Sequence, residues 1–414
     1  MEIKRLKGTY DILPGKIEEW QYVENVAKNI FDKYDFEEMR VPVIENVDLF
    51  ARSSGETSDV VKKEMYTFED KGGRKIALRP EGTAGIIRAY IENGMASMLS
   101  PLKVCYRMPM YRYDNVQKGR QREFNQIGCE LLGSKSYEAD VEIVELIEDL
   151  LNALNIKNFK LEVNSIGCKE DRAKYREALR NFVKPNLDKY CDDCKVRYEK
   201  NPLRILDCKV EKDKEMNEGA PEITDYLCDD CKAHFENFKK MLTSLGIEFT
   251  VNSRIVRGLD YYTKTVFEFT SNEDGLAILG GGRYDDLIQE LGGVSTPAVG
   301  FAIGEERLLS LFEDCNEGKE FKNNPDLFIA YIGENANVYA TKLARKLRDE
   351  GIKVEKDIME RSLKAQLKFA DKKGAKFVVT IGDDEIASGK CKIKNMETGN
   401  QEEIEIDKIS NYLK

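Results

Sequence analysis

Two strand-like runs joined by a basic loop occupy residues 104–133, VCYRMPMYRYDNVQKGRQREFNQIGCELLG. Polar and apolar side chains alternate in these runs, which predicts a hairpin of two long strands. Arg112 should lie on the ordered first strand, whereas the loop DNVQKGRQ crowds mobile basic groups around one glycine. A guanidinium group binds phosphate through two parallel hydrogen bonds, so this hairpin suits an anionic ligand. An ordinary surface hairpin with a solvated charged tip is the alternative.

Length and composition favour a multidomain protein outside the membrane. A chain of 414 residues suggests two or three domains. No apolar run is long enough to span a bilayer, and the start MEIKRLKGTYDILP has no signal-peptide pattern. We therefore expect a cytoplasmic protein whose ten cysteines are reduced thiols or metal ligands and not disulfides. The net charge of −10 does not indicate a nucleic-acid binder, but a local basic face would suffice for RNA.

The segment before the hairpin contains two features that point to contacts with a ligand or another subunit. Residues 40–50 (RVPVIENVDLF) read as a strand in which Pro42 favours a sheet edge, a bulge or a contact with another subunit. A second strand turns into a helix at residues 79–85 (RPEGTAG). Thr83 is a candidate N-cap of that helix. Alternatively, the carboxylate of Glu81 and the hydroxyl at this turn could bind an ammonium group.

Residues 168–250 are helical and highly charged, and they look like an insertion. This segment carries two matching pairs, YCDDC and LCDDC, whose CxxC spacing resembles a structural zinc site. The alternative is four reduced cysteines near the starts of helices. The possible zinc ligands are Cys191, Cys194, Cys228 and Cys231.

Three blocks after the insertion contain arginines or glycines at the ends of predicted strands. Residues 255–270 open with Arg257 before a glycine, two tyrosines and an alternating strand. Residues 278–293 place three consecutive glycines between a strand and a helix, where a backbone can approach a ligand closely. Residues 297–314 run from a strand into a helix whose first turns contain Arg307. Taken singly, this arginine is a solvated helix residue more often than a ligand contact.

The last part of the chain predicts a separate small α/β domain. After a polar linker at about residues 318–325, the pattern is strand, helix, strand, helix, strand, followed by two late strands. A lysine-rich stripe in its second half is usually a solvated face, yet it is also the best candidate for an RNA-binding surface in this acidic chain. These lysines are Lys364, Lys368, Lys372, Lys373 and Lys376.

Over nearly its whole length, the chain resembles the histidyl-tRNA synthetases, which are class II aminoacyl-tRNA synthetases. The C-terminal ERSLKAQLKFADKKGAKFVVTIGDDE is similar to the anticodon-binding domain of that family. Five further blocks match in order: LRPEGTAG at 78–85, YRYDNVQKGRQREFNQIGCE at 111–130, RGLDYYTKTVFEF at 257–269, GGGRYDDL at 280–287 and GFAIGEERL at 300–308.

The resemblance implies an α+β fold with a class II antiparallel-sheet catalytic core, a helical insertion and a C-terminal α/β anticodon-binding domain. The implied boundaries are 1–168 with 251–318 for the core, 169–250 for the insertion and 325–414 for the anticodon-binding domain. The family is homodimeric, with its first motif, here around residues 41–50, at the subunit interface. The implied reaction is ATP-dependent activation of L-histidine to histidyl-adenylate, followed by transfer of histidine to the 3′ end of tRNA(His).

The resemblance also implies roles for three arginines. Arg112 and Arg257 would hold the α-phosphate of ATP from two sides, because negative charge grows at phosphorus in the transition state. Arg307 would bind the far end of ATP, near the adenine and the γ-phosphate. Mg²⁺ would accompany ATP as co-substrate and bridge its phosphates, with no dedicated protein metal site in the catalytic centre.

The residues that would bind histidine form a second set. Glu130 and Tyr262 would hydrogen-bond the two imidazole nitrogens, which can discriminate sharply because an analogue lacking a nitrogen leaves a buried polar group unpaired. The whole set is Glu81, Gly82, Thr83, Gln126, Glu130, Tyr261 and Tyr262. The hairpin tip would contact the acceptor end of tRNA through Gln117, Lys118 and Arg120.

The chain departs from the family pattern at the hairpin tip, where Asn115 and Val116 replace the usual arginine–proline pair. Its only histidine, His234, lies outside every matched block, so catalysis by a histidine of the enzyme is not expected. Two other functions are compatible with such a core: a regulatory subunit of the first enzyme of histidine biosynthesis, and a non-catalytic RNA-binding module. The retained arginines and the complete C-terminal domain favour the synthetase.

Overall fold

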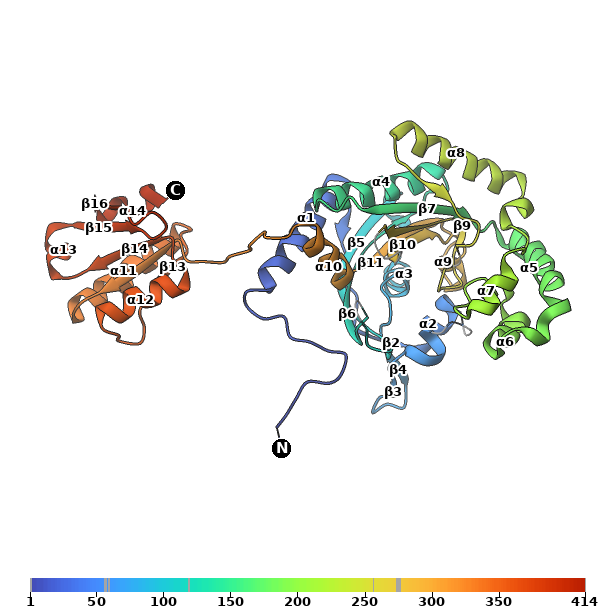
Figure 1. Ribbon diagram of the computed structural model, residues 1–414, viewed down its shortest axis with the longest axis horizontal. Coiled ribbons are helices and arrows are strands. Elements are labelled where there is room, and N and C mark those ends of the chain that lie inside the picture. Colours follow the sequence, from blue (N-terminus) through green and yellow to red (C-terminus); the bar gives the residue numbers. More distant parts are fainter. Residues whose placement is uncertain are drawn as a thin grey trace. The chain divides into compact units, whose positions relative to one another are not determined.

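A computed structural model describes residues 2–55, 58, 60–117, 120–255, 257–272 and 277–413 (Figure 1). The chain divides into two compact units, one of residues 1–13 with 19–319 and the other of residues 14–18 with 320–414. The predicted insertion at 169–250 belongs to the same unit as the predicted core, and its boundaries stay a prediction.

An eight-stranded, largely antiparallel sheet forms the centre of the first unit, in the order β1-β5-β6-β11-β10-β9-β7-β8. Only the two short edge strands pair in parallel with their neighbours. This sheet confirms the predicted antiparallel core. Its strands are β1 (Glu37–Glu38), β5 (Leu102–Tyr111), β6 (Glu123–Leu132), β7 (Phe159–Ser165), β8 (Thr250–Val251), β9 (Thr263–Ser271), β10 (Ala277–Arg283) and β11 (Ala298–Gly304).

The hairpin predicted at residues 104–133 is strands β5 and β6, which pair along their full length from Leu102↔Leu132 to Tyr111↔Glu123. Alternate residues of β5, among them Tyr106 and Met108, pack against α3 (Thr83–Glu92). Arg107 points to the other face, where its guanidinium pairs with a carboxylate of α10 (Glu305–Cys315). The alternation in the sequence therefore reflects a sheet that is covered on both faces.

The three consecutive glycines of residues 280–282 lie inside strand β10, so the prediction that they separate a strand from a helix was wrong. Glycine is needed at these positions because neighbouring groups occupy the space that a side chain would fill. A Cβ on Gly280 would collide with the guanidinium of Arg257, and one on Gly281 would collide with the carbonyl of Gly300 and the ring of Phe267. The glycine run therefore lets other side chains cross the sheet surface.

A small three-stranded sheet, β2-β4-β3, carries the segment expected at the subunit interface. Only residues Ile44–Asn46 of the predicted strand 40–50 are strand, so the prediction was wrong at residues 40–43 and from Val47 onward. Asn46 caps the helix α2 that starts there, because its side chain accepts a hydrogen bond from the Asp48 N–H at 2.9 Å. The elements are β2 (Ile44–Asn46), α2 (Val47–Ser54), β3 (Thr67–Glu69) and β4 (Lys75–Leu78).

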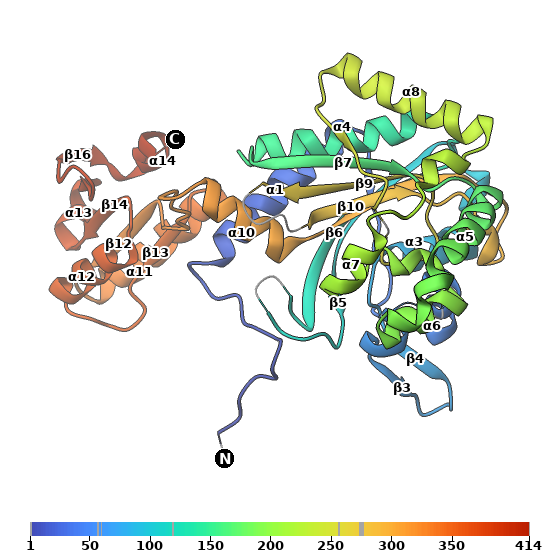
Figure 2. The ribbon, with the colours of Figure 1, turned by 45° about the vertical axis from the view of Figure 1, so that its right-hand side comes forward.

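The remaining helices of the first unit cover the main sheet and form the predicted insertion. Helices α4 and α8 run side by side over one face of the sheet, and α5, α6 and α7 group together (Figures 1 and 2). Apolar residues at helical spacing bury one face of α4. The helices are α1 (Ile17–Lys33), α4 (Tyr137–Ala153), α5 (Lys169–Val183), α6 (Asp192–Lys200), α7 (Glu211–Asn217), α8 (Asp229–Leu245) and α9 (Leu287–Glu290).

The second unit is the predicted small α/β domain, with a mixed sheet in the order β13-β12-β14-β15-β16. The first three strands pair in parallel and the last two strands are antiparallel additions. Its elements are β12 (Leu327–Tyr331), α11 (Glu334–Asp349), β13 (Val354–Lys356), α12 (Leu363–Lys373), β14 (Phe377–Ile381), α13 (Asp383–Ser388), β15 (Lys390–Asn395), β16 (Gln401–Glu405) and α14 (Ile409–Leu413). Among the helices described in either unit, none has the length and apolar character needed to cross a membrane.

Candidate active site

Two adjoining cavities bring most of the predicted site residues together. The first cavity, of about 220 Å³, is lined by Glu81, Thr83, Arg112, Gln126, Glu130, Arg257, Tyr261 and Tyr262. The second cavity, of about 470 Å³, is lined by Gln117, Arg120 and Arg307, and it shares Arg112 and Gln126 with the first. Gly82 lines neither cavity, and Lys118 lies outside the described residues.

A buried carboxyl group, Glu130 on β6, forms the floor of the first cavity. Its side chain accepts hydrogen bonds from the hydroxyls of Thr83, at 2.7 Å, and Tyr284. Burial raises the pKa of Glu130 to about 8, although these hydroxyl donors oppose the rise. A Cβ on Gly300, in the neighbouring strand, would collide with this carboxylate, so the glycine makes room for it. The first cavity therefore ends in a polar group that can exchange a proton near neutral pH.

The side chain of Glu81, and not that of Thr83, accepts the free N–H groups at the start of helix α3. Its carboxylate accepts hydrogen bonds from the N–H groups of Thr83 and Ala84, at 2.8 and 2.9 Å. Thr83 is the first helical residue, so the N-cap role considered for it was wrong. The N-cap is Gly82, where a Cβ would collide with the ring of Tyr106. The sequence EGT thus places one carboxylate and one hydroxyl at the cavity wall, with the glycine packed behind them.

The two predicted catalytic arginines line the first cavity from separate elements. Arg112 directly follows β5, and its Nε donates to the carbonyl of Pro80 at 2.8 Å. Arg257 lies 3.3 Å from a carboxylate oxygen of Glu268, while no described group bonds its buried Nε. The two guanidinium groups are therefore held in place by the protein with donor capacity left for an anion.

Gln126 supplies an unsatisfied acceptor between the two cavities. Its side-chain oxygen, Oε1, is buried and has no hydrogen-bond partner among the described residues. A buried polar atom without a partner is rare and costs free energy unless a ligand completes it. A ligand that donates a hydrogen bond at this position, such as an ammonium group, would satisfy the oxygen.

The comparisons with known proteins agree with this geometry. A model of the family described as histidyl-tRNA synthetase matches residues 8–308, and a model described as anticodon binding domain matches residues 326–414. The chain belongs to the histidyl-tRNA synthetase family. Its class II fold, with an antiparallel-sheet core and an anticodon-binding domain, is thereby confirmed, as is the predicted enzyme class, histidine–tRNA ligase.

Relatives match this family member from end to end. A histidine–tRNA ligase of Acetivibrio thermocellus is 52% identical, with 99% of this chain and 98% of the relative covered. One from Caldanaerobacter subterraneus subsp. tengcongensis is 50% identical, and all of both chains is covered. The crystal structure of apo S. aureus histidyl-tRNA synthetase is 40% identical, covers all of both chains and superposes with a TM-score of 0.85. These proteins support histidine activation and charging of tRNA(His) as the activity of the chain.

The structure adds residues to the site that the sequence analysis did not name. Tyr284, which follows the glycine run, donates to Glu130, and its position in GGGRYDDL could have indicated it. Three residues of the insertion, Arg204, Asp207 and Lys209, line the second cavity. Arg204 also donates to the carboxylate of Asp260, at 3.2 Å, in the RGLDYY block. No sequence signal shows that the insertion reaches the site, because this contact joins residues 56 positions apart.

The predicted set of four zinc-binding cysteines does not assemble. Cys191 and Cys194 lie with Cys208, whereas Cys228 and Cys231 lie with Cys168. The prediction of one site from both CxxC pairs was therefore wrong in this structure. Each pair begins a different helix, α6 or α8, and the two helix starts contribute to different groups.

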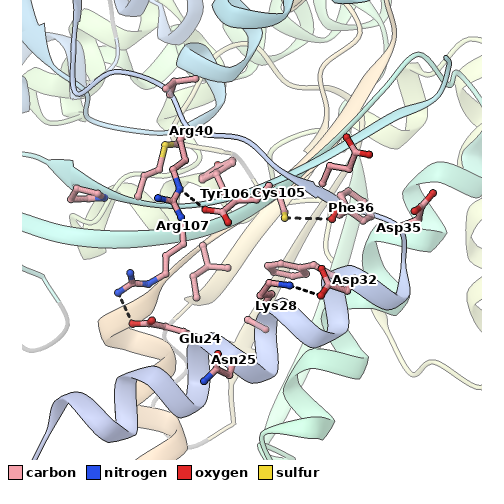
Figure 3. Close-up of a pocket in the computed structure, with 18 of the residues that line it drawn as sticks. Glu24, Asn25, Lys28, Asp32, Asp35, Phe36, Arg40, Cys105, Tyr106 and Arg107 are labelled. Carbon is pink, nitrogen blue, oxygen red and sulfur yellow. Dashed lines mark hydrogen bonds and ion pairs between the residues drawn. The ribbon is translucent and has the colours of Figure 1, made fainter. Parts of the chain in front are cut away.

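A third and larger cavity, of about 770 Å³, lies away from these residues, between α1 and the β1–β5 edge of the sheet (Figure 3). Charged side chains line it, including Glu24 and Arg107, which form an ion pair at 2.6 Å. None of the predicted site residues lines this cavity. This larger cavity is thus not the one that gathers the family motifs.

The raised pKa of Glu130 predicts how stability depends on pH. A free glutamate has a pKa near 4.5, and Glu130 in the folded protein has one of about 8. The folded state therefore holds an extra proton between these values, so this contribution to stability is complete below about pH 4.5 and is lost as the pH rises through 8. Glu130→Gln should flatten the fall of the melting temperature between pH 5 and 9, measured without ligand. Glu236→Gln, at an exposed position, is the control. Identical slopes of melting temperature against pH in Glu130→Gln and wild type would contradict the prediction.

Proposed function

We propose that the first cavity binds histidine and the second cavity binds ATP, so that the two substrates meet at Arg112. The observation that carries this proposal is the shared lining of the two cavities by Arg112 and Gln126. The histidine carboxylate attacks the α-phosphate of ATP and displaces pyrophosphate. This carboxylate is already ionised at neutral pH, so the step needs no base from the enzyme.

Arg112 and Arg257 act by placing positive charge where negative charge develops on the α-phosphate. Both groups are fixed before the substrates arrive, Arg112 by the carbonyl of Pro80 and Arg257 by Glu268. Arg307, in the first turn of α10, holds the distal part of ATP in the second cavity. Preorganised charges of this kind do not need to reorient during the reaction, which is why they accelerate it.

Mg²⁺ fits the second cavity as a companion of ATP. It prefers oxygen ligands and keeps several waters while it binds substrate phosphates. The cavity offers carboxylates of Glu64, Asp114 and Asp207 at its wall, which could hold such a hydrated ion. When bound, the ion would neutralise phosphate charge.

Histidine recognition is assigned to the polar groups of the first cavity. Gln126 Oε1, with Glu81 and Thr83 nearby, accepts from the ammonium group. Glu130 and Tyr262 face the imidazole nitrogens, and Tyr261 packs against Tyr262 with ring centroids 4.7 Å apart. The carboxyl group of Glu130 can pair with either protonation state of the ring, because its pKa of about 8 lies close to neutral pH.

The tRNA is assigned to two surfaces, one in each unit. The hairpin tip, including Gln117 and Arg120, borders the second cavity and contacts the acceptor end. The lysine stripe of the second unit is exposed at all five positions and contributes to anticodon binding. We further propose that the protein works in the cytoplasm, where its ten free cysteines remain reduced.

A homodimer is supported by the segment that matches the first family motif, because that motif lies at the subunit interface of the family. Ile44 of this segment lies in the edge strand β2 and is 51% exposed, so it is accessible to a second subunit. Sedimentation equilibrium of the full chain should give twice the monomer mass, and a stable monomer at micromolar concentration would exclude the dimer.

Pyrophosphate exchange into ATP with each of the twenty amino acids tests the proposal. We expect exchange with histidine alone, because any other amino-acid side chain would leave the buried polar groups of Glu130 and Tyr262 unpaired. Exchange with several amino acids would contradict the assigned pocket. A folded protein that binds histidine but exchanges with none of them would favour the regulatory or RNA-binding alternatives.

A further inference from the structure

The predicted insertion, together with Cys168 directly before it, contains two separate groups of three cysteines and one aspartate. In each group the four possible ligand atoms all lie within 4.8 Å of one another. We propose that the insertion holds two structural Zn²⁺ ions, one in each group. The first zinc site is Cys168, Asp171, Cys228 and Cys231, and the second zinc site is Cys191, Cys194, Cys208 and Asp213.

The first zinc site lies where two helices begin. Cys168 is the N-cap of α5 and Cys228 is the N-cap of α8. Asp171 and Cys231 are the third residues of these helices, so each N-cap residue has its partner on the same side of the first turn. The Asp171 carboxylate also accepts the N–H of Cys228 at 2.9 Å, which ties the two helix starts together. Asp171 and Cys231 are buried.

The second zinc site joins the start of α6 to the segment before and within α7. Cys191 is the N-cap of α6, Cys194 lies in its first turn, and both face Cys208 and Asp213. The Cys191 and Cys208 sulfurs are 3.8 Å apart, and Cys208 Sγ lies 3.3 Å from Asp213 Oδ2. Asp213 also accepts the N–H of Cys191 at 3.2 Å. Cys194, Cys208 and Asp213 are buried.

The geometry suits zinc and does not suit a disulfide. A tetrahedral Zn²⁺ with zinc–sulfur distances of about 2.3 Å separates its sulfurs by about 3.8 Å, which matches the Cys191–Cys208 distance. A disulfide would need a sulfur–sulfur distance of about 2.05 Å and would leave one thiol of each trio unpaired. Zinc accepts thiolate and carboxylate ligands together, so three cysteines and one aspartate form a complete tetrahedral set.

The second zinc site would also stabilise part of the active site. Asn201 and Arg204, between its two cysteine-bearing segments, both donate to Asp260 in the RGLDYY block, at 3.1 and 3.2 Å. Asp207, next to the ligand Cys208, lines the second cavity. A metal that fixes residues 191–213 would therefore fix one wall of the second cavity.

Elemental analysis of the full-length protein, purified without chelator, tests both sites. We expect two zinc ions per chain. Cys168→Ser and Cys208→Ser should each remove about one ion, whereas the control Cys315→Ser, outside both groups, should keep two. If one ion is bound by the two CxxC pairs, Cys168→Ser and Cys208→Ser will leave the zinc content unchanged, which would overturn the proposal. Iron in place of zinc, or no metal, would also overturn it.

Differential alkylation of the wild-type protein keeps the proposal testable if these variants do not fold. Adding a strong chelator should newly expose the six cysteines of the two groups, identified by peptide mass. Cys315 should react before and after chelation, because it lies outside both groups. Labelling of all six without chelator, or a disulfide among them, would overturn the assignment.

Discussion

Arg257→Ala should lower the rate of histidine-dependent pyrophosphate exchange by about 10²–10³-fold, the loss typical of removing one preorganised group that stabilises transition-state charge. Histidine binding should remain, since most of the groups assigned to the amino acid lie at the start of α3 and on β6 and not in the RGLDYY segment. Arg257 is fixed by Glu268, and the glycine run leaves space for its guanidinium. The arginine therefore stabilises the charged transition state more than it stabilises the bound amino acid.

Two further measurements separate this role from a structural one. Arg257→Lys keeps the charge but loses the planar fork, so its exchange rate should recover only in part. Arg345→Ala, an exposed arginine of α11 in the second unit, should exchange like wild type. Equilibrium binding of histidine and the melting temperature should be close to wild type in Arg257→Ala. Unchanged exchange in Arg257→Ala would refute the assignment.

Arg283→Met should destabilise the first unit by about 3–5 kcal/mol, because it removes the guanidinium that balances the charge of the buried Asp140 carboxylate. Both side chains are fully buried, and Arg283 Nε donates to Asp140 at 3.0 Å. His234 Nε2 lies 2.7 Å from the same carboxylate. This cluster joins β10 to α4 and α8, so the only histidine of the chain has a structural place and not a catalytic one.

Urea unfolding of the apo protein measures this effect. The double variant Arg283→Met with Asp140→Leu should lose less stability than the sum of the two single variants, since neither then leaves a buried charge alone. Arg74→Met removes an exposed ion pair with Asp70 and should leave the unfolding midpoint unchanged. Strictly additive losses in the double variant would show that the two groups are not coupled.

The hairpin and the ligand-facing turns could be predicted from the sequence because their determinants are local. Alternation along β5 and β6 records the pleat of a strand. Arg112, which was expected on the first strand, lies one residue beyond its end. The matched blocks then identified eight residues that do line the first cavity. The strand prediction failed after Asn46. The side chain of Asn46 caps helix α2, so residues 47–50 are helical and not strand.

The other features depend on which segments meet in space, and only the tertiary structure decided them. Equal CxxC spacing suggested one metal site, but Cys168 and Cys208, which carry no such spacing, complete two different groups. Gly280 in β10 is explained by a guanidinium that comes from another segment, and Gly281 by groups of the two neighbouring strands. Arg204 reaches Asp260 across 56 residues. Sequence periodicity reports the surroundings of one element, whereas a ligand set or a cavity wall is a product of long-range packing.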